Sequence, residues 1–80
     1  MFKASNVAKT IGRALQKQLD YQDAQNQWDG TVYITDNISV QIHGDILLVN
    51  RYDGKEILCG PFHKTIKNAI EEIKDLLERN

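Results

Sequence analysis

The sequence has one cysteine and no long apolar run, and each scarcity excludes a class of protein. With Cys59 alone, no internal disulfide can form, which fits a reducing compartment. No apolar stretch approaches the roughly 20 residues that span a bilayer, and the N-terminus lacks the apolar core of a signal peptide. We therefore expect a cytoplasmic protein that does not enter a membrane.

Proline is equally scarce, with one residue in a chain that is 41% hydrophobic and 26% charged. This composition is typical of a globular domain and not of a disordered tail. We expect a single compact domain over residues 1–80, because chains divide into several domains only well beyond this size. A domain this small is marginally stable, so a partner subunit or a bound macromolecule could add to its stability.

An excess of positive charge is missing, since the formal net charge is −1, which argues against a generic polyanion binder. The charges are nevertheless segregated along the chain. Residues 1–19 carry bases and no acid, whereas residues 20–50 carry acids and neither lysine nor arginine. The bases are Lys3, Lys9, Arg13 and Lys17, and the acids are Asp20, Asp23, Asp29, Asp36 and Asp45.

Residues suited to catalysis are few. His43, Cys59 and His63 are the only soft metal ligands or strong nucleophiles, and a structural zinc site would need four ligands. The sequence contains no phosphate-binding glycine loop and no zinc-protease, kinase or dinucleotide fingerprint. We therefore expect no enzymatic activity, no cofactor and no bound metal.

Two segments have the period of an amphipathic helix. From Phe2 to about Asp20 the apolar residues recur every four positions, with Ser5 or Asn6 as the expected N-cap. Gly12 lowers the stability of this helix unless something packs closely there. The second helix should follow an N-cap at Thr65. Its expected buried stripe is Ile66, Ala69, Ile70, Ile73 and Leu77.

Short alternating runs between the helices predict a meander of four antiparallel strands. The polar segment 20–30 lacks a period and is predicted to be a frayed helix end and a loop, with Trp28 closing one end of the core. Thr31–Thr35 and Ile38–His43 alternate, and a loop with Asn37 in the left-handed region would pair Val32 with Val40. The third strand should contain the run "ILLV", and the turn in "YDGK" should join it to the fourth.

The third strand has aliphatic residues at consecutive positions, so two registers are open. A two-residue turn at Gly44 and Asp45 pairs Ile42 with Leu47 and sends Ile46 and Leu48 outward, whereas a three-residue loop exchanges the two sets. The turn signal in "YDGK" predicts a pairing of Tyr52 with Lys55 and of Leu48 with Cys59. In the first register the outer face collects Ile46, Leu48, Ile57 and Cys59, with Tyr33 and Tyr52 at its margin. Gly60 and Pro61 should end the last strand, and Phe62 should seal the core.

The fold class expected from this order is α+β: helix, four-stranded antiparallel meander, helix. The helices could lie on opposite faces of the sheet, in which case the second apolar surface is core. Alternatively both pack on the face lined by Val32, Ile34, Val40 and Ile42. We expect the second arrangement, because Thr31, Ser39, Gln41 and His43 suit a face that meets water, and the outer apolar patch would then be an interaction site.

The residues expected to bind a protein partner are those of this outer face and of the acidic turn tips. An apolar patch can contact a partner directly, and aspartates at turn tips can face a basic protein surface. The set is Tyr33, Asp36, Asp45, Leu48, Tyr52, Asp53 and Ile57.

A second set of residues predicts nucleic-acid binding. Three bases at four-residue spacing form a solvent-facing stripe on the first helix, which could follow phosphates or be an ordinary solvated face. The order helix, meander, helix is similar to that of the double-stranded RNA-binding domain, whose last helix meets phosphate with lysines at its N-terminus. The residues that would bind nucleic acid are Lys9, Arg13, Lys17, Lys64 and Lys67.

"GPFHKTIKNAIEEI" resembles a strand-to-helix junction of small bacterial and phage domains. A compact acidic α+β domain without a catalytic motif also resembles the small phage and mobile-element proteins that block host defences, including anti-CRISPR proteins. This resemblance implies a non-enzymatic inhibitor that binds and occludes a bacterial defence complex. A homodimer through the outer sheet face or an edge strand is compatible with either function.

Overall fold

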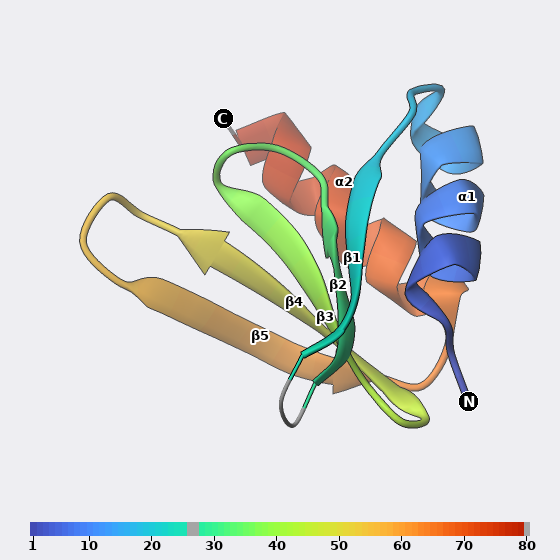
Figure 1. The fold of residues 1–80 in the computed structure, drawn as a ribbon. Helices are drawn as coiled ribbons and strands as arrows, with labels where there is room; N and C mark the ends of the chain where they lie inside the picture. The colour runs from blue at the N-terminus through green and yellow to red at the C-terminus, as the bar shows by residue number, and fades with distance from the viewer. Residues whose placement is uncertain (26–27, 80) are drawn as a thin grey trace.

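The computed structural model describes residues 1–25 and 28–79, and within them the chain forms two helices and one five-stranded antiparallel sheet (Figure 1). The strands are neighbours in chain order, so β1 and β5 are the sheet edges. The elements are α1 (Ala4–Leu15), β1 (Asp20–Gln25), β2 (Trp28–Tyr33), β3 (Ile38–His43), β4 (Ile46–Tyr52), β5 (Ile57–His63) and α2 (Ile66–Arg79). The predicted α+β class and the order helix, antiparallel meander, helix are confirmed.

The prediction of four strands is wrong, because segment 20–30 contributes β1 and the start of β2. Tyr21 pairs with Val32 and Gln22 pairs with Thr31. The side chains of residues 20–24 are all exposed, so this part of the edge strand produces no apolar alternation. Backbone pairing with β2 forms β1 instead. The prediction for the Trp28 side chain lies outside the described part of the structure.

The core joins both helices to one alternating set of strand residues. From α1 it takes Val7 and Ile11, and from α2 it takes Ala69 and Ile73. The strand residues in the same cluster include Val32, Val40, Ile42, Leu47 and Val49. We call the side of the sheet that carries these strand residues the inner face, and the opposite side the outer face.

The first helix is shorter than predicted at both ends. It begins at Ala4, with Lys3 as an N-cap that makes no side-chain hydrogen bond, so the predicted cap at Ser5 or Asn6 is wrong. It ends where Gln16 adopts the left-handed region, with φ 57°. The Gln16 N–H donates to the Arg13 carbonyl at 3.3 Å and the Lys17 N–H to the Gly12 carbonyl at 2.9 Å. These two bonds close the helix C-terminus and turn the chain toward β1.

The second helix follows the prediction. Thr65 Oγ1 accepts a hydrogen bond from the Asn68 N–H at 3.1 Å, as an N-cap does. Ala69 and Ile73 are fully buried, while Ile66, Ile70 and Leu77 are partly buried against the core. The predicted stripe is therefore the face that α2 buries.

The turns between β2 and β3 and between β3 and β4 give the predicted pairings. Val32 pairs with Val40 across β2 and β3, and Ile42 pairs with Leu47 across β3 and β4, which selects the two-residue turn over the three-residue loop. Asn37 does not take the predicted left-handed conformation. Thr35 Oγ1 instead accepts hydrogen bonds from the N–H groups of Asn37 and Ile38, both at 3.1 Å, and these bonds shape the turn.

The register of β4 and β5 differs from the prediction by a longer loop. Tyr52 pairs with Ile57 and not with Lys55. The Asp53 carboxylate accepts hydrogen bonds from the Lys55 N–H at 2.8 Å and the Glu56 N–H at 2.9 Å, which stabilises a four-residue loop. The side-chain acceptor of Asp53 thus replaces the tight turn that "DG" predicts.

The end of β5 is also mispredicted. The strand continues through Gly60 and Pro61 to His63, with an irregularity in register opposite Leu48 and Asn50. An edge strand tolerates proline because its outward side needs no N–H donor. Leu48 therefore pairs with Phe62 and not with Cys59, and Phe62 is 65% exposed instead of sealing the core.

Candidate functional site

The outer face brings together side chains from four strands, β2 to β5. Directly paired residues of an antiparallel sheet point to the same side, and alternate residues of one strand share a face. The pairs Leu48 with Phe62 and Tyr52 with Ile57 therefore lie on the outer face, as does Tyr33 through its pairing with Ser39. Ser39 in turn pairs with Asn50, which places β2, β3 and β4 in one continuous surface.

Four large apolar side chains on this face are exposed, and we call them the outer-face patch. Ile57 is 64% exposed and Phe62 65%, both on the edge strand β5. Tyr33 and Tyr52 are 44% and 46% exposed. Cys59 lies between Ile57 and Phe62 along β5 and is also exposed. Clustered exposed apolar side chains on one face are typical of an interaction surface.

A shallow hollow of about 170 Å³ lies at one end of the patch. Tyr33, Tyr52 and Ile57 line it together with residues of the loop between β2 and β3, including Asp36. Two backbone-anchored bonds hold this loop against β4: the Tyr52 N–H donates to the Asn37 carbonyl at 2.7 Å, and Asn37 Nδ2 donates to the Tyr52 carbonyl at 3.1 Å. The structure thus joins four of the seven predicted partner-binding residues at one place.

Leu48, another predicted residue, is on the outer face but only 7% exposed. Its neighbours along this face include Phe62 and Gln41, the residues with which it pairs. Leu48 can therefore support the patch from beneath but offers a partner little surface.

Asn50 is a buried polar residue in the middle of the outer face. It is 4% exposed, and its Nδ2 donates to Gln41 Oε1 at 2.6 Å. Its Oδ1 has no hydrogen-bond partner within the part of the chain that the structure describes. The centre of the outer face thus contains an amide pair between apolar groups.

The three predicted turn aspartates lie at opposite ends of the sheet. Asp36 and Asp53 are in the β2–β3 and β4–β5 loops, which share the end with the hollow, whereas Asp45 is in the β3–β4 turn. Asp45 Oδ1 lies 3.1 Å from the N-terminal amino group of Met1, with both groups exposed. The Glu56 and Lys55 N–H groups hold the pKa of the Asp53 carboxyl below its ordinary value of 3.8. Only Asp36 and Asp53 can therefore act together with the hollow.

Phe62 was missed as a site residue, because Gly60 and Pro61 before it are common signals for the end of a strand. An edge strand can carry a proline and continue, and positions 57, 59 and 62 reach one face only because of the register irregularity near Asn50. No local signal in the sequence marks that irregularity.

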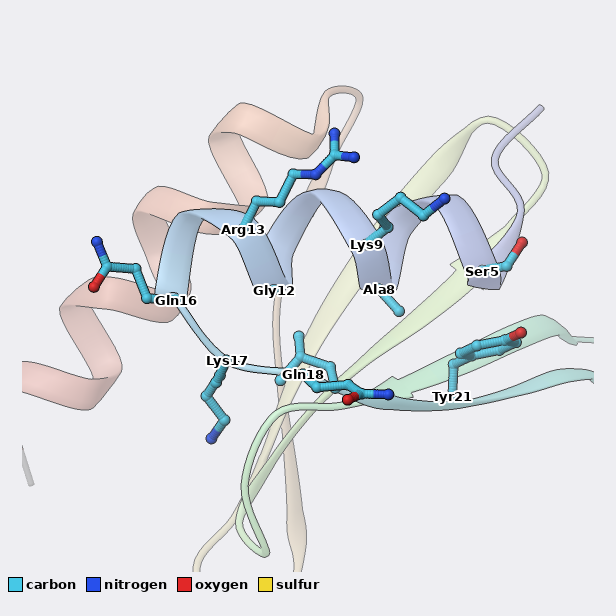
Figure 2. A pocket seen from close by; sticks show the side chains of 10 residues that line it. Ser5, Ala8, Lys9, Gly12, Arg13, Gln16, Lys17, Gln18 and Tyr21 are labelled. Carbon is cyan, nitrogen blue, oxygen red and sulfur yellow. The ribbon is translucent and has the colours of Figure 1, made fainter.

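The basic residues of the first helix border a second hollow, of about 650 Å³, between α1 and β1 (Figure 2). Lys9 and Arg13 line it from the helix, and Tyr21 lines it from β1. Lys17 also lines it, but its Nζ donates to the Ile34 carbonyl at 3.0 Å. Lys64 lies just before α2 and Lys67 in its first turn, so the five predicted nucleic-acid residues fall in two separate regions of the chain.

One of the three soft ligands, His63, is paired with a carboxylate. His63 Nε2 lies 2.6 Å from Glu72 Oε1, with both side chains largely buried, so this contact ties β5 to α2. Within residues 1–25 and 28–79, no three His, Cys, Asp or Glu side chains are grouped so that they could hold a metal ion. Across the same ranges, neither helix has both the length and the apolar character needed to cross a bilayer.

Comparison of the chain with protein-family models, curated proteins and solved structures finds no match. The function proposed below therefore depends on the residues and geometry of this chain.

Proposed function

We propose that the protein is a non-enzymatic protein-binding domain that uses the outer-face patch as its contact surface. The observation that carries the proposal is the exposure of Tyr33, Tyr52, Ile57 and Phe62 on one face. Large aromatic and aliphatic side chains at the centre of an interface supply most of its binding energy, and aromatic residues are enriched there. Exposing them to water has no benefit for folding.

The proposal includes the placement of both helices against the inner face. Its support is the single core cluster, in which Ile11 of α1 and Ile73 of α2 join Val40 and Leu47 of the sheet. The two helices also contact each other. With both helices on that side, the outer face is open to a partner.

The electrostatic part of the proposal concerns the end of the patch with the hollow. Asp36 and Asp53 are exposed in the two loops at this end. Charges at the rim of an apolar patch steer a partner of opposite charge and raise the rate of association. The partner surface should therefore present an apolar centre with lysine or arginine beside it.

The class of partner that we propose is a bacterial defence complex in the cytoplasm, which the protein would inhibit by occlusion. The support is the general character of the chain, a small acidic α+β domain without a catalytic motif. Covering a site on a larger complex requires only a rigid surface that binds tightly, and a short antiparallel sheet with an apolar face can provide it.

The experiment is an affinity capture from bacterial lysate with the wild-type protein and two matched variants. Tyr52→Ser alters the patch, and Tyr21→Ser is the control, because Tyr21 is 47% exposed, as Tyr52 is at 46%, but lies toward α1. Each capture is divided into nuclease-treated and untreated halves and analysed by mass spectrometry. We expect a defined complex that survives nuclease, is retained by Tyr21→Ser and is lost with Tyr52→Ser.

Two results would overturn the proposal. Loss of all captured material on nuclease treatment would assign the function to the basic residues of α1, with binding that weakens steeply as salt is added. Equal capture by Tyr52→Ser and the wild type, with Phe62→Ser also unchanged, would show that the outer face makes no contact. Light scattering over a range of concentrations separately tests a homodimer, which predicts a mass above 9.2 kDa.

A further inference from the structure

The hollow between α1 and β1 has features that the outer-face patch does not explain. Its floor includes the small residues Ala8 and Gly12 of the helix and Leu19 of the following segment. Figure 2 shows Tyr21 standing on β1 on the side toward α1, while Lys9 and Arg13 extend from the helix away from the strand. An apolar floor is thus bordered by a strand on one side and by bases on the other.

The strand that borders this hollow is a free edge of the sheet. β1 is first in the strand order, so the N–H and C=O groups of its alternate residues point away from β2 with no neighbouring strand to pair with. The opposite edge, β5, contains Pro61 and a register irregularity, both of which hinder the addition of a further strand. Residues 20–25 contain no proline.

The charges beside the free edge of β1 indicate which kind of strand could pair with it. Among the described residues, neither Lys9 nor Arg13 takes part in an ion pair or a side-chain hydrogen bond. β1 itself carries Asp20 and Asp23, so two copies of this strand paired edge to edge would bring carboxylates together. An incoming strand with acidic side chains toward α1 would instead meet the two unpaired bases.

We infer that an extended acidic peptide segment of another protein adds to the free edge of β1 and places alternate side chains in the hollow beneath α1. Main-chain hydrogen bonds to β1 hold the segment, the floor around Ala8, Leu19 and Tyr21 accepts its apolar side chains, and Lys9 and Arg13 bind its carboxylates. This site is separate from the outer-face patch, since Tyr21 and Tyr52 belong to opposite sides of the sheet.

A peptide strand fits this surface better than a nucleic acid. A phosphate backbone has only acceptor oxygens, so it could pair with the N–H groups of the strand edge but not with its C=O groups, whereas a peptide strand pairs with both. Only Lys9 and Arg13 offer unengaged cations here, because Lys17 donates to the Ile34 carbonyl, and the formal net charge of the chain is −1.

The test is a titration of the full chain with a capped synthetic peptide, monitored through the backbone amide chemical shifts of the protein. Every second residue of the peptide is threonine, and the residues between are valine or glutamate. We expect perturbations confined to residues 20–25 and to the α1 residues that line the hollow. At low salt, the same peptide with lysine for glutamate should bind about tenfold more weakly, because two ion pairs are replaced by repulsions.

A second pair of peptides isolates strand addition from charge. N-methylation of alternate residues removes either the N–H groups that face β1 or those that face solvent, because the two sets alternate along a strand. The peptide methylated on the N–H groups that face β1 should lose binding, and the peptide methylated on the solvent-facing groups should keep it. Equal behaviour of the two would exclude strand pairing.

Protein variants locate the site. Lys9→Glu combined with Arg13→Glu should weaken the acidic peptide about tenfold, whereas Lys64→Glu combined with Lys67→Glu, and separately Tyr52→Ser, should leave its affinity unchanged. The inference is wrong if no shifts occur at about millimolar peptide or if shifts lie on the outer face. It is also wrong if oligothymidine binds this surface more tightly than the peptide, since that result would identify a nucleic-acid site.

Discussion

The inner and outer faces of the sheet share one alternation of side chains but differ in what those side chains contact. Val40 and Leu47 on the inner face are buried in a core that includes both helices. On the outer face Tyr52 and Ile57 are exposed, and its buried residues include Leu48 and an asparagine, Asn50, that is paired with Gln41. The inner face is therefore constrained by packing, whereas the outer face can vary for binding with little effect on folding.

The largest expected difference between the faces comes from truncating an isoleucine on each side. Ile73 in α2 is fully buried in the core, and Ile57 is 64% exposed on the outer face. Ile73→Ala should lower the free energy of unfolding by about 2–5 kcal/mol through lost burial and an added cavity, whereas Ile57→Ala should change it by no more than about 0.5 kcal/mol.

Denaturant unfolding of the two variants measures both values. A cost for Ile57→Ala as large as that for Ile73→Ala would break the comparison, because it would mean that the outer face is packed against another part of the chain.

A smaller effect is expected where the segment after the first helix passes close to Gly12. A Cβ on Gly12 would lie 2.6 Å from the Lys17 carbonyl oxygen, too near for contact without movement of the helix end. Gly12→Ala should therefore lower the free energy of unfolding by about 1 kcal/mol, even though alanine favours a helix by a similar amount.

The control for this prediction is Ala14→Gly in the same helix, at an exposed position. It should show the ordinary propensity loss of up to about 1 kcal/mol. If Gly12→Ala instead raised the free energy of unfolding, the segment after Gln16 would be able to move without loss of stability. The denaturant midpoints of both variants show whether each change stabilises or destabilises the protein.

The smallest effect concerns the loop that sets the register of the outer face. The Glu56 and Lys55 N–H groups lower the pKa of Asp53, so its carboxylate contributes stability that is present above its ordinary pKa of 3.8. This contribution is lost as the pH falls through the lowered value, because protonation removes the charge that the two N–H groups favour.

We expect a small acid-side loss of stability in the wild type that is reduced in Asp53→Asn, which keeps a side-chain acceptor and removes the titrating group. Thermal unfolding between about pH 2 and pH 5 makes the measurement. Identical pH profiles for the two proteins would show that the Asp53 bonds do not hold the β4–β5 loop.

Much of the fold could be predicted because its signals are local. The stripe of α2, the cap at Thr65 and the pairing of Ile42 with Leu47 follow from side-chain period and turn chemistry within a few residues. The site was predicted in part for the same reason, since Tyr33 lies between the core residues Val32 and Ile34 along the chain. Phe62 was not, because the irregularity in register opposite β5 depends on the neighbouring strand.

The sequence by itself determined which side of most helices and strands is buried, because the apolar residues must recur with the period of the element to share one side. Tertiary structure alone decided that segment 20–25 is a strand, since its backbone pairs with β2 while the side chains of residues 20–24 are exposed to water. It also decided that Asp36 and Ile57 border one hollow, because the hydrogen bonds between Asn37 and Tyr52 join segments that are distant along the chain. Contacts of this kind depend on the relative position of whole elements, which no local pattern encodes.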